Sequence, residues 1–313
     1  MRTMYIQKSL SLLIEEFRER GKWGTAHIYQ TTYNVFTSFC QGKNLRFEQL
    51  TPSMLKHFEE YLRQRGCTWN TVSTYMKTLR AVYNQAVESG IAIYTPRLFR
   101  HVYTGTLADK RRTMEMNDIG LLLRQIEEEQ YSSNALTPKD RSKILFILMF
   151  LLRGIPFVDL VYLRKKDLKG NTLSYRRKKT GRPVHVHLSD EALRLIELMR
   201  NPDMQSPYLF PVIRAAEGTE KAYREYQSAL RKFNNHLAVI KQELGIETNF
   251  SSYSARHTWA TAAYRCEIHP GVISEAMGHS SIRVTETYLK PFEDHRIDEA
   301  NRQVMEFVKR QAK

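Results

Sequence analysis

Four segments in the first hundred residues carry apolar side chains at helical spacing, and this pattern constrains the fold more than any other feature of the chain. In the first segment, Leu10, Leu13 and Phe17 recur every three or four residues. The third begins at Thr51-Pro52, where a good N-terminal cap is followed by proline at the first helical position. Because short turns separate the segments, we expect four helices packed as a bundle. The expected helices span residues 9–18, 25–41, 52–66 and 71–89.

The remaining two thirds of the chain combine helical segments with one clear β signal. Residues 172–178 and 183–188 flank the turn at Lys179-Thr-Gly181, and the second of these arms alternates apolar and polar side chains. This pattern predicts a β-hairpin with one buried face. The apolar run at 144–152 is too short to cross a membrane and therefore predicts a buried helix. Further helices are expected at 114–126, 189–200, 219–244, 255–265, 270–277, 281–289 and 294–311.

The stretch between these two parts is irregular and basic. It includes His101 and a basic run at 110–112, so we expect an interdomain linker that lies against the phosphate backbone of a nucleic acid. The sequence therefore predicts a mainly α-helical protein with a small β-hairpin. In chain order we expect a helical domain over 1–100, a linker over 101–112, and an α+β domain over 113–313 that ends in a helical tail.

The chain carries a formal net charge of +15, and this charge is unevenly distributed. Residues 1–112 hold 17 Lys and Arg against 8 Asp and Glu, a net of +9, whereas the rest hold 31 against 25, a net of +6. Basic surfaces bind nucleic acid by releasing counterions, although charge that only keeps a protein soluble would look the same. Cys40, Cys67 and Cys266 are odd in number and far apart, and neither a signal peptide nor a membrane span is evident. We therefore expect reduced cysteines in a cytoplasmic, nucleoid-associated protein.

Residues 253–288 combine side chains that suit attack on a phosphodiester. They read Tyr-Ser-Ala-Arg-His from 253, Gly-His-Ser-Ser from 278, and a tyrosine at 288. Such an attack needs a nucleophile, positive charge on the non-bridging oxygens, and an acid for the leaving oxygen. Tyr288 is the candidate nucleophile, and Arg256 can hold two phosphate oxygens through its planar fork. His279 can donate to a phosphate oxygen, and Lys179 at the hairpin turn can protonate the leaving group.

Taken in order, these motifs resemble the tyrosine recombinase (phage integrase) family. The resemblance rests on Lys179-Thr-Gly in a hairpin, Arg256-His-Thr-x-Ala-Thr, Met-Gly-His279-Ser-Ser, and Tyr288 nine residues after that histidine. Each motif alone is common, but their order and spacing together are specific, and they extend over residues 113–300. The helical domain at 1–100 resembles the SAM-like core-binding domain of the same family.

The resemblance implies a two-domain clamp on duplex DNA. In this family the tyrosine forms a 3′-phosphotyrosine bond and releases a 5′ hydroxyl, which preserves the energy of the phosphodiester and requires neither metal nor cofactor. Strands are exchanged in a homo-tetramer on two synapsed sites with inverted repeats, and the free protein is expected to be a monomer. A DNA-bending accessory protein is a further partner that the resemblance allows. The helical tail is expected to pack into a neighbouring protomer, with packing in its own chain as the alternative.

One departure from the family concerns its first arginine. The family usually carries Gly-Leu-Arg-x-x-Glu-Leu, whereas this chain reads Gly154-Ile-Pro156-Phe-Val-Asp159-Leu, with proline in place of the arginine. Arg153 precedes that proline by three residues, which is about one helical turn. We therefore hypothesise that Arg153 supplies the missing positive charge. The alternative is a surface Arg153 and a site with a single activating arginine.

The second departure is Tyr253, which stands where the family has the histidine of His-x-x-Arg. A phenol with an ordinary pKa of about 10 is a poor base at neutral pH but can donate a hydrogen bond to a phosphate oxygen. The role of base would then fall to His279 or to a water molecule. His257 is expected to be a buried structural histidine that points away from the site.

These observations predict a site-specific DNA recombinase that carries out inversion, or integration and excision. No β-rich segment precedes the first predicted helix, so an arm-binding domain is not expected, and this favours reactions at simple sites. Two other interpretations remain open. One is a type IB topoisomerase-like enzyme that relaxes DNA by the same chemistry, and the other is a sequence-specific DNA-binding protein whose altered site is inactive.

Overall fold

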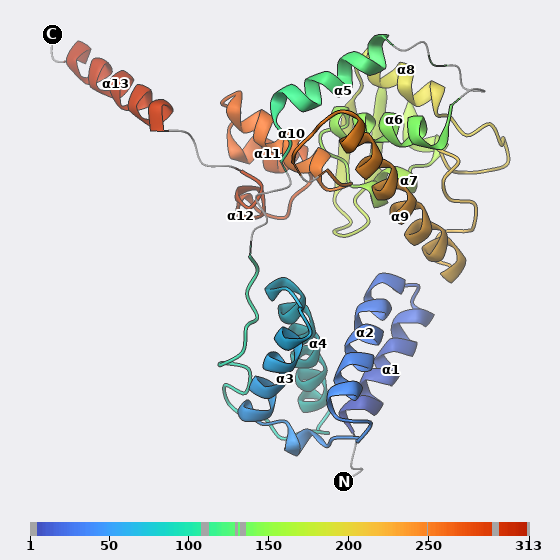
Figure 1. Cartoon of the computed structure of the whole chain (residues 1–313), viewed down its shortest axis with the longest axis vertical. Coiled ribbons are helices and arrows are strands. Elements are labelled where there is room, and N and C mark those ends of the chain that lie inside the picture. The colour runs from blue at the N-terminus through green and yellow to red at the C-terminus, as the bar shows by residue number, and fades with distance from the viewer. Residues whose placement is uncertain are drawn as a thin grey trace. The chain divides into compact units, whose positions relative to one another are not determined.

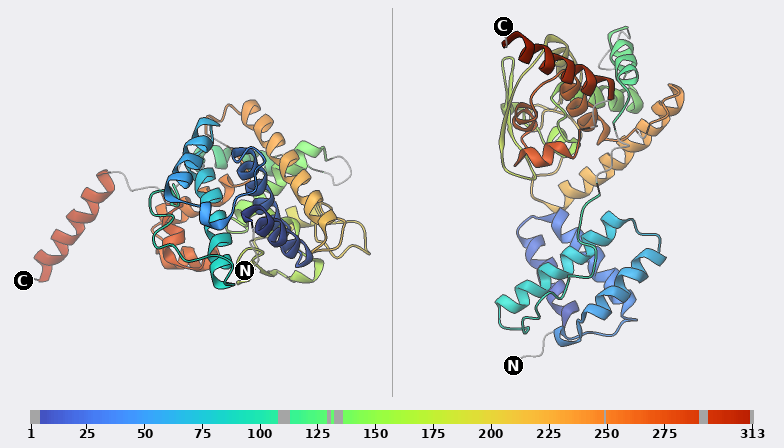
Figure 2. Two further views of the ribbon diagram at one scale, coloured as in Figure 1. Left: turned by 90° about the horizontal axis from the view of Figure 1, so that it is seen from below. Right: turned by 90° about the vertical axis from the view of Figure 1, so that its left-hand side faces the viewer.

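The computed structural model describes residues 5–107, 113–128, 131, 136–248, 250–289 and 294–311. The chain forms two compact units, Met1–Ala108 with Arg214–Gln227 and Asp109–Ile213 with Ser228–Lys313. Helices dominate both units, and a small antiparallel sheet belongs to the second (Figure 1, Figure 2). The predicted fold class, mainly α-helical with one small sheet, is therefore confirmed.

The first unit is built on four helices that correspond to the four segments with helical periodicity. They are α1 (Ile6–Glu19), α2 (Trp23–Phe39), α3 (Pro52–Gln64) and α4 (Trp69–Glu88), with a short 3-10 helix at Phe47–Gln49. Thr51 caps α3 as predicted, because its Oγ1 accepts a hydrogen bond from the Met54 amide at 3.2 Å. Thr68 caps α4 in the same way. These caps satisfy amides that the first turn of a helix leaves without partners.

Aromatic and aliphatic side chains from all four helices form the core of this unit. Phe36 and Phe58 meet edge to face, with ring centroids 5.3 Å apart, and both are fully buried. The chain beyond α4 adds to the same core, because Leu98, Phe99 and Val102 are buried in it. The core of the first unit therefore continues beyond the predicted end of the helical domain.

The segment that follows this core is held against the bundle by hydrogen bonds. The Tyr103 amide donates to Glu59 Oε1 at 2.6 Å. Asn70 donates to the Leu107 carbonyl and accepts from the Leu107 amide. Hydrogen bonds therefore hold this part of the predicted linker against α3 and α4. The basic run at 110–112 lies outside the described residues.

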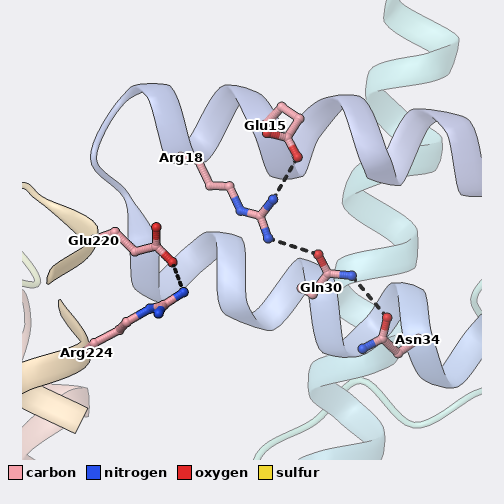
Figure 3. A network of polar contacts seen from close by, with 6 residues as sticks. All are labelled: Glu15, Arg18, Gln30, Asn34, Glu220 and Arg224. Atoms are coloured by element: carbon pink, nitrogen blue, oxygen red, sulfur yellow. Dashed lines mark hydrogen bonds and ion pairs between the residues drawn. The ribbon is translucent and has the colours of Figure 1, made fainter.

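Residues 214–227 belong to the first unit, and Trp23 at the start of α2 donates to the Gly218 carbonyl at 2.7 Å. Polar side chains of this region form hydrogen bonds at the surface: Arg18 with Glu15 and Gln30, Gln30 with Asn34, and Arg224 with Glu220 (Figure 3). Exposed pairs of this kind contribute little to stability. They order the surface rather than drive folding.

The second unit contains the helices that follow. They are α5 (Met116–Glu128), α6 (Pro138–Leu151), α7 (Phe157–Val161), α8 (Asp190–Leu198), α10 (Ser254–Arg265), α11 (Pro270–Ala276), α12 (Ile282–Glu286) and α13 (Asp294–Gln311), with α9 (Glu220–Glu243) shared between the units and a 3-10 helix at Lys165–Asp167. Helix α6 begins before its apolar run, because Thr137 and Asp140 form a capping box. Helix α7 escaped prediction since five residues are too few to show a helical period. No helix of the described residues is long and apolar enough to cross a membrane.

Three strands make up the sheet. They are β1 (Leu168–Lys169), β2 (Thr172–Arg176) and β3 (Pro183–His187), in the antiparallel order β1-β2-β3. The predicted hairpin is confirmed, and a two-residue strand is added at one edge. Leu173, Val184 and Val186 are buried, whereas His185 and His187 are exposed, as the alternation predicted.

Helix α13 has an exposed apolar stripe. Ile297, Val304 and Phe307 are 57%, 58% and 62% exposed. These three side chains are therefore not packed against their own chain, which was the alternative for the tail. Packing into a neighbouring protomer stays a prediction.

Candidate active site

Arg256 lies in the first turn of α10, and its side chain is buried in the second unit. Nη1 donates to the Gly154 carbonyl at 2.6 Å, and Nη2 donates to the Met277 carbonyl at 2.8 Å. Gly154 permits this approach, because its φ is +69° and a Cβ added there would lie 2.9 Å from Arg256 Cα. Two backbone carbonyls therefore aim the guanidinium, and neither of them neutralises its charge.

His279 follows α11 and lies against Arg256. Its Nε2 is 2.6 Å from Arg256 Nη2, and its Nδ1 is 2.8 Å from Thr285 Oγ1. Because a guanidinium only donates, Nε2 accepts here, and the ring proton on Nδ1 points to Thr285. Burial, together with the charges of Arg256 and Arg177, lowers the pKa of His279 to about 3. The imidazole is therefore neutral at pH 7, with its acceptor on the side of Arg256.

Tyr288 lies in the turn after α12, not within a helix as the sequence predicted. Its backbone is held on both sides: the amide donates to the Thr285 carbonyl at 2.9 Å, and the carbonyl accepts from Thr261 Oγ1 at 3.2 Å. The side chain packs against a small apolar cluster from α10 and α11 and the residue after α11: Ala260, Ala263, Ile273 and Met277. The position of the tyrosine is thus set by three neighbouring helices.

The Tyr288 side chain completes the polar group. Its ring stacks on His279, with centroids 5.2 Å apart and an interplanar angle of 18°. Arg256 Cζ lies 5.7 Å from the centroid of the same ring, and the proximity of Tyr288 contributes to the raised pKa of Tyr253. The candidate nucleophile is therefore docked in the site of its own chain, next to the arginine predicted to bind phosphate.

Tyr253 and His257 both lie close to this tyrosine, and their own ring centroids are 5.7 Å apart. Desolvation, followed by the proximity of Tyr288, raises the pKa of Tyr253 above its ordinary value. Tyr253 therefore stays protonated at neutral pH and can donate a hydrogen bond. His257 is buried as expected, but it does not point away from the site, because its ring centroid lies 4.5 Å from that of Tyr288. The start of α10 places both side chains next to the candidate nucleophile.

Arg153 and Lys179 do not join this hydrogen-bonded group among the described residues. Arg153 follows α6 in the left-handed conformation, with φ +59°, and its Nη1 donates to the His185 carbonyl at 3.2 Å. Lys179 is exposed at the turn between β2 and β3. Both residues therefore border the hairpin rather than the Tyr288 hydroxyl.

Arg177 is a site residue that sequence reasoning missed. It follows β2, is 7% exposed, and forms an ion pair through Nε with Asp159 Oδ2 at 2.6 Å. Its Nη1 donates to the Met277 carbonyl, which also accepts from Arg256. Asp159 Oδ1 accepts from the Lys178 amide at 2.8 Å, so the carboxylate holds this end of the strand. Desolvation raises the pKa of Asp159, and the Lys178 amide and Arg177 oppose that rise.

A second arginine joins the hairpin to the histidine loop. Arg182 donates from its guanidinium to the carbonyls of His279 and Ser280. Gly278, with φ +63°, lets the two segments approach, because an added Cβ would lie 2.8 Å from a side-chain carbon of Val184 and 3.3 Å from Arg177 Cγ. The hairpin and the loop that carries His279 thus pack closely and are joined by hydrogen bonds.

A sequence signal for Arg177 did exist. Leu173, Tyr175 and Arg177 alternate along one arm of the hairpin, and Leu173 faces the core. An arginine at the next position of that face is expected to be buried and to need a partner. Asp159 supplies that partner from α7, an element that the sequence pattern did not reveal.

Both halves of the chain match known families. Residues 8–100 match the phage integrase SAM-like domain, and residues 112–295 match the phage integrase family. No curated protein sequence matches the chain significantly.

Solved structures with a similar fold include two integrases. The Tn1549 transposon integrase in complex with transposon right end DNA has a TM-score of 0.67 at 14% identity, over 97% of this chain and 100% of that one. A lambda integrase dimer bound to a COC′ core site has a TM-score of 0.63 at 15% identity, over 91% and 95%. A lambda integrase tetramer bound to a Holliday junction has a TM-score of 0.62 at 15% identity, over 92% and 78%. At identities of 14% and 15%, the likeness shows a shared fold and no more.

Proposed function

The chain belongs to the phage integrase family of tyrosine recombinases, and from this membership we propose that Tyr288 attacks a DNA strand and becomes linked to it as a 3′-phosphotyrosine. The observation that carries the proposal is the position of the Tyr288 ring, which stacks on His279 and lies 5.7 Å from Arg256 Cζ. An arginine that lies beside the nucleophile in the free protein can hold the phosphate that the nucleophile attacks. The tyrosine and the phosphate would then meet at Arg256.

In the proposed step, the Tyr288 oxygen forms a bond to phosphorus while the bond from phosphorus to the 5′ oxygen breaks. Arg256 stabilises the charge that builds up on the non-bridging oxygens. Lys179 gives a proton to the leaving 5′ oxygen, a role that its exposed position at the hairpin turn supports. Attack by a 5′ hydroxyl on the phosphotyrosine reverses these bond changes, so the reaction consumes no cofactor.

The phenolic proton of Tyr288 must leave during the attack. Tyr253 is a poor recipient, because its own pKa is raised. The unprotonated Nε2 of His279 supports this histidine as the acceptor, with a water molecule as the alternative. An incoming phosphate raises the pKa of His279, because its negative charge offsets the arginines that lower that pKa. Once protonated, Nε2 can donate to the phosphate, which is the role that the sequence predicts for His279.

Arg153 enters the proposal as the candidate that the sequence offers for a second positive charge. It precedes Gly154, whose carbonyl holds Arg256. Its guanidinium would have to leave the His185 carbonyl to reach a phosphate. The Arg153→Ala variant is the direct test, and cleavage near the wild-type rate would remove Arg153 from the site.

At the level of the whole reaction, we propose that the helical domain at 1–100 and the catalytic domain at 113–313 clamp duplex DNA. Two inverted-repeat sites would be synapsed by a homo-tetramer for inversion, or for integration and excision. The fold shared with a lambda integrase tetramer bound to a Holliday junction supports this assembly. The exposed apolar stripe of α13 supports packing of the tail into a neighbouring protomer.

A nicked duplex tests the proposed function directly. Covalent adducts are first mapped on the DNA that flanks the gene, and the mapped site is rebuilt with a nick that lets the cleaved fragment escape. The wild-type protein is expected to accumulate a covalent adduct, and Tyr288→Phe is expected to bind the same DNA without forming one. Binding without any adduct would identify an inactive DNA-binding protein. Adducts without a junction between two sites would identify a topoisomerase.

A further inference from the structure

We propose that Arg177 is a catalytic residue that acts beside Arg256 and supplies the second positive charge on the scissile phosphate. It would replace the arginine that is lost where Pro156 stands. This assignment rests on the proposed function, because it requires a phosphodiester to bind at Arg256.

The first argument is geometric. The Met277 carbonyl accepts hydrogen bonds from both Arg177 Nη1 and Arg256 Nη2. Two donors that share one acceptor lie within about 6 Å of each other. Arg177 comes from the end of β2 and Arg256 from α10, so two distant parts of the chain bring their guanidinium groups to one point. An oxygen of a phosphate bound to Arg256 is then within reach of Arg177.

The second argument is the charge balance. Arg177 and Arg256 are 7% and 3% exposed, and two buried like charges are costly unless an anion compensates them. Asp159 compensates one of them through its ion pair with Arg177. Since His279 is neutral, two positive charges and one negative charge leave a net charge of +1. The single negative charge of a phosphodiester would balance it.

The third argument is that Arg177 retains a free donor. Its Nε and Nη1 are engaged as described, and Nη2 has no protein partner within the described part of the chain. Arg153, in contrast, donates to the His185 carbonyl and shares no acceptor with Arg256. A guanidinium that is anchored on one side and open on the other is suited to hold an anion in a defined place.

A purely structural role for Arg177 would look similar in a simple activity assay, because the residue also anchors the hairpin. The test therefore compares two substrates of one sequence. One has an ordinary scissile phosphate, and the other has a methylphosphonate there, in which a methyl group replaces one charged oxygen. Loss of a phosphate-neutralising arginine matters less when the phosphate carries no charge, whereas loss of a structural anchor matters equally for both.

Cleavage of each substrate is measured for wild type, Arg177→Gln, Arg256→Gln and Arg153→Gln. The double variant Arg177→Gln with Asp159→Asn removes both partners of the ion pair, so no buried charge is left alone if the single variant folds poorly. Arg176→Gln is the matched control, because Arg176 is the preceding residue, is exposed, and among the described residues donates only to the Gly181 carbonyl. Thermal unfolding and DNA binding are measured for every variant.

On the phosphate, Arg177→Gln and the double variant are expected to lose about 100- to 1000-fold in cleavage rate. On the methylphosphonate, their loss relative to wild type is expected to shrink at least about tenfold, as for Arg256→Gln, because there is less charge to stabilise. Arg176→Gln is expected to cleave both substrates like wild type.

Equal losses on the two substrates would overturn the assignment and leave Arg177 as an anchor. The assignment is also overturned if Arg153→Gln shows the substrate-dependent loss and Arg177→Gln does not. Failure of the proposed function is distinct, since the wild-type protein would then form no adduct on the mapped site. In that case the assignment fails together with the function on which it rests.

Discussion

The two compact units bury different kinds of side chain. The core of the first unit is aromatic and aliphatic, and its one buried carboxylate among the described residues, Glu59, is satisfied by Lys56 and by the Tyr103 amide. The second unit also has an apolar core, but beside it are buried charged and polar groups: Asp159, Arg177, Arg256 and His279. Burial of charge costs stability, whereas burial of apolar surface drives folding.

This difference predicts that mutations in the two units have different effects. Packing and helix caps account for the first unit, so its mutations should act on stability. In the second unit, desolvated charges lie beside the candidate nucleophile, and such groups concentrate at functional sites. Mutations there should change the chemistry more than the stability, and variants in the two units can test that separation.

The largest expected effect is on stability, in the first unit. Phe58→Ala removes a fully buried ring and is expected to lower the free energy of unfolding by about 3–5 kcal/mol. At saturating DNA, the single-turnover cleavage rate of the folded protein should be unchanged. Denaturant unfolding and a single-turnover assay measure the two quantities. Ile93→Ala is the control, because Ile93 is 75% exposed and its loss should matter little. A cleavage defect in folded Phe58→Ala would break the comparison.

The next effect is on the cleavage rate, and it compares alanine substitutions at two glycines. Gly154 and Gly66 both have positive φ, at +69° and +77°, so alanine at either costs about 1–2 kcal/mol. At Gly154 the new Cβ also meets Arg256, while at Gly66 nothing lies within 4 Å. Gly154→Ala is therefore expected to reduce cleavage about 100-fold by shifting Arg256. Gly66→Ala should only lower the unfolding midpoint. Equal cleavage rates for the two variants would contradict the proposed role of Arg256.

Two threonines after the histidine loop give a smaller effect. Thr285→Val leaves the Nδ1 proton of His279 without a buried partner, which is expected to cost about 1–3 kcal/mol of unfolding free energy and to slow cleavage. Thr287→Val is the matched control, since Thr287 is exposed and its hydroxyl donates, within the described part of the chain, only to the Val284 carbonyl. The comparison uses denaturant midpoints and cleavage rates of both variants. If Thr287→Val is as damaging as Thr285→Val, the hydrogen bond to His279 is not the cause.

The last effect depends on pH: it is smallest near neutrality and grows as the pH falls. The pKa of His279 is about 3 in the folded protein, against an ordinary value of 6.5. Between these values the unfolded chain binds more protons than the folded one, so stability falls as the pH is lowered from 6.5 towards 3. Above pH 6.5 this contribution is constant. Unfolding midpoints of wild type and His279→Gln from about pH 4 to pH 8 should therefore diverge only below the ordinary pKa of histidine. Divergence on the alkaline side of neutrality would show that the folded imidazole titrates there.

The helices and the hairpin could be predicted because their signals are local. Thr51 and Pro52 mark the start of α3, and the alternation at Val184 and Val186 marks the buried face of β3. Helix α7 and strand β1 could not be predicted, because they are too short for any period to show. The hydrogen bond from the Tyr103 amide to Glu59 could not be predicted either, since it joins residues 44 apart in the sequence. Contacts at such separations depend on the packing of whole elements.

The candidate reactive residues could be predicted without a structure, because Tyr288, Arg256 and His279 stand in a characteristic order and spacing along the chain. Which further groups lie beside them became known from the folded chain. It brought Arg177 to the carbonyl that Arg256 uses, placed His257 against the candidate nucleophile, and left Arg153 at the hairpin. The physical reason is that charge, desolvation and hydrogen bonding act through space. A residue's chemistry can be predicted from its type, whereas its pKa and its partners depend on what the fold places beside it.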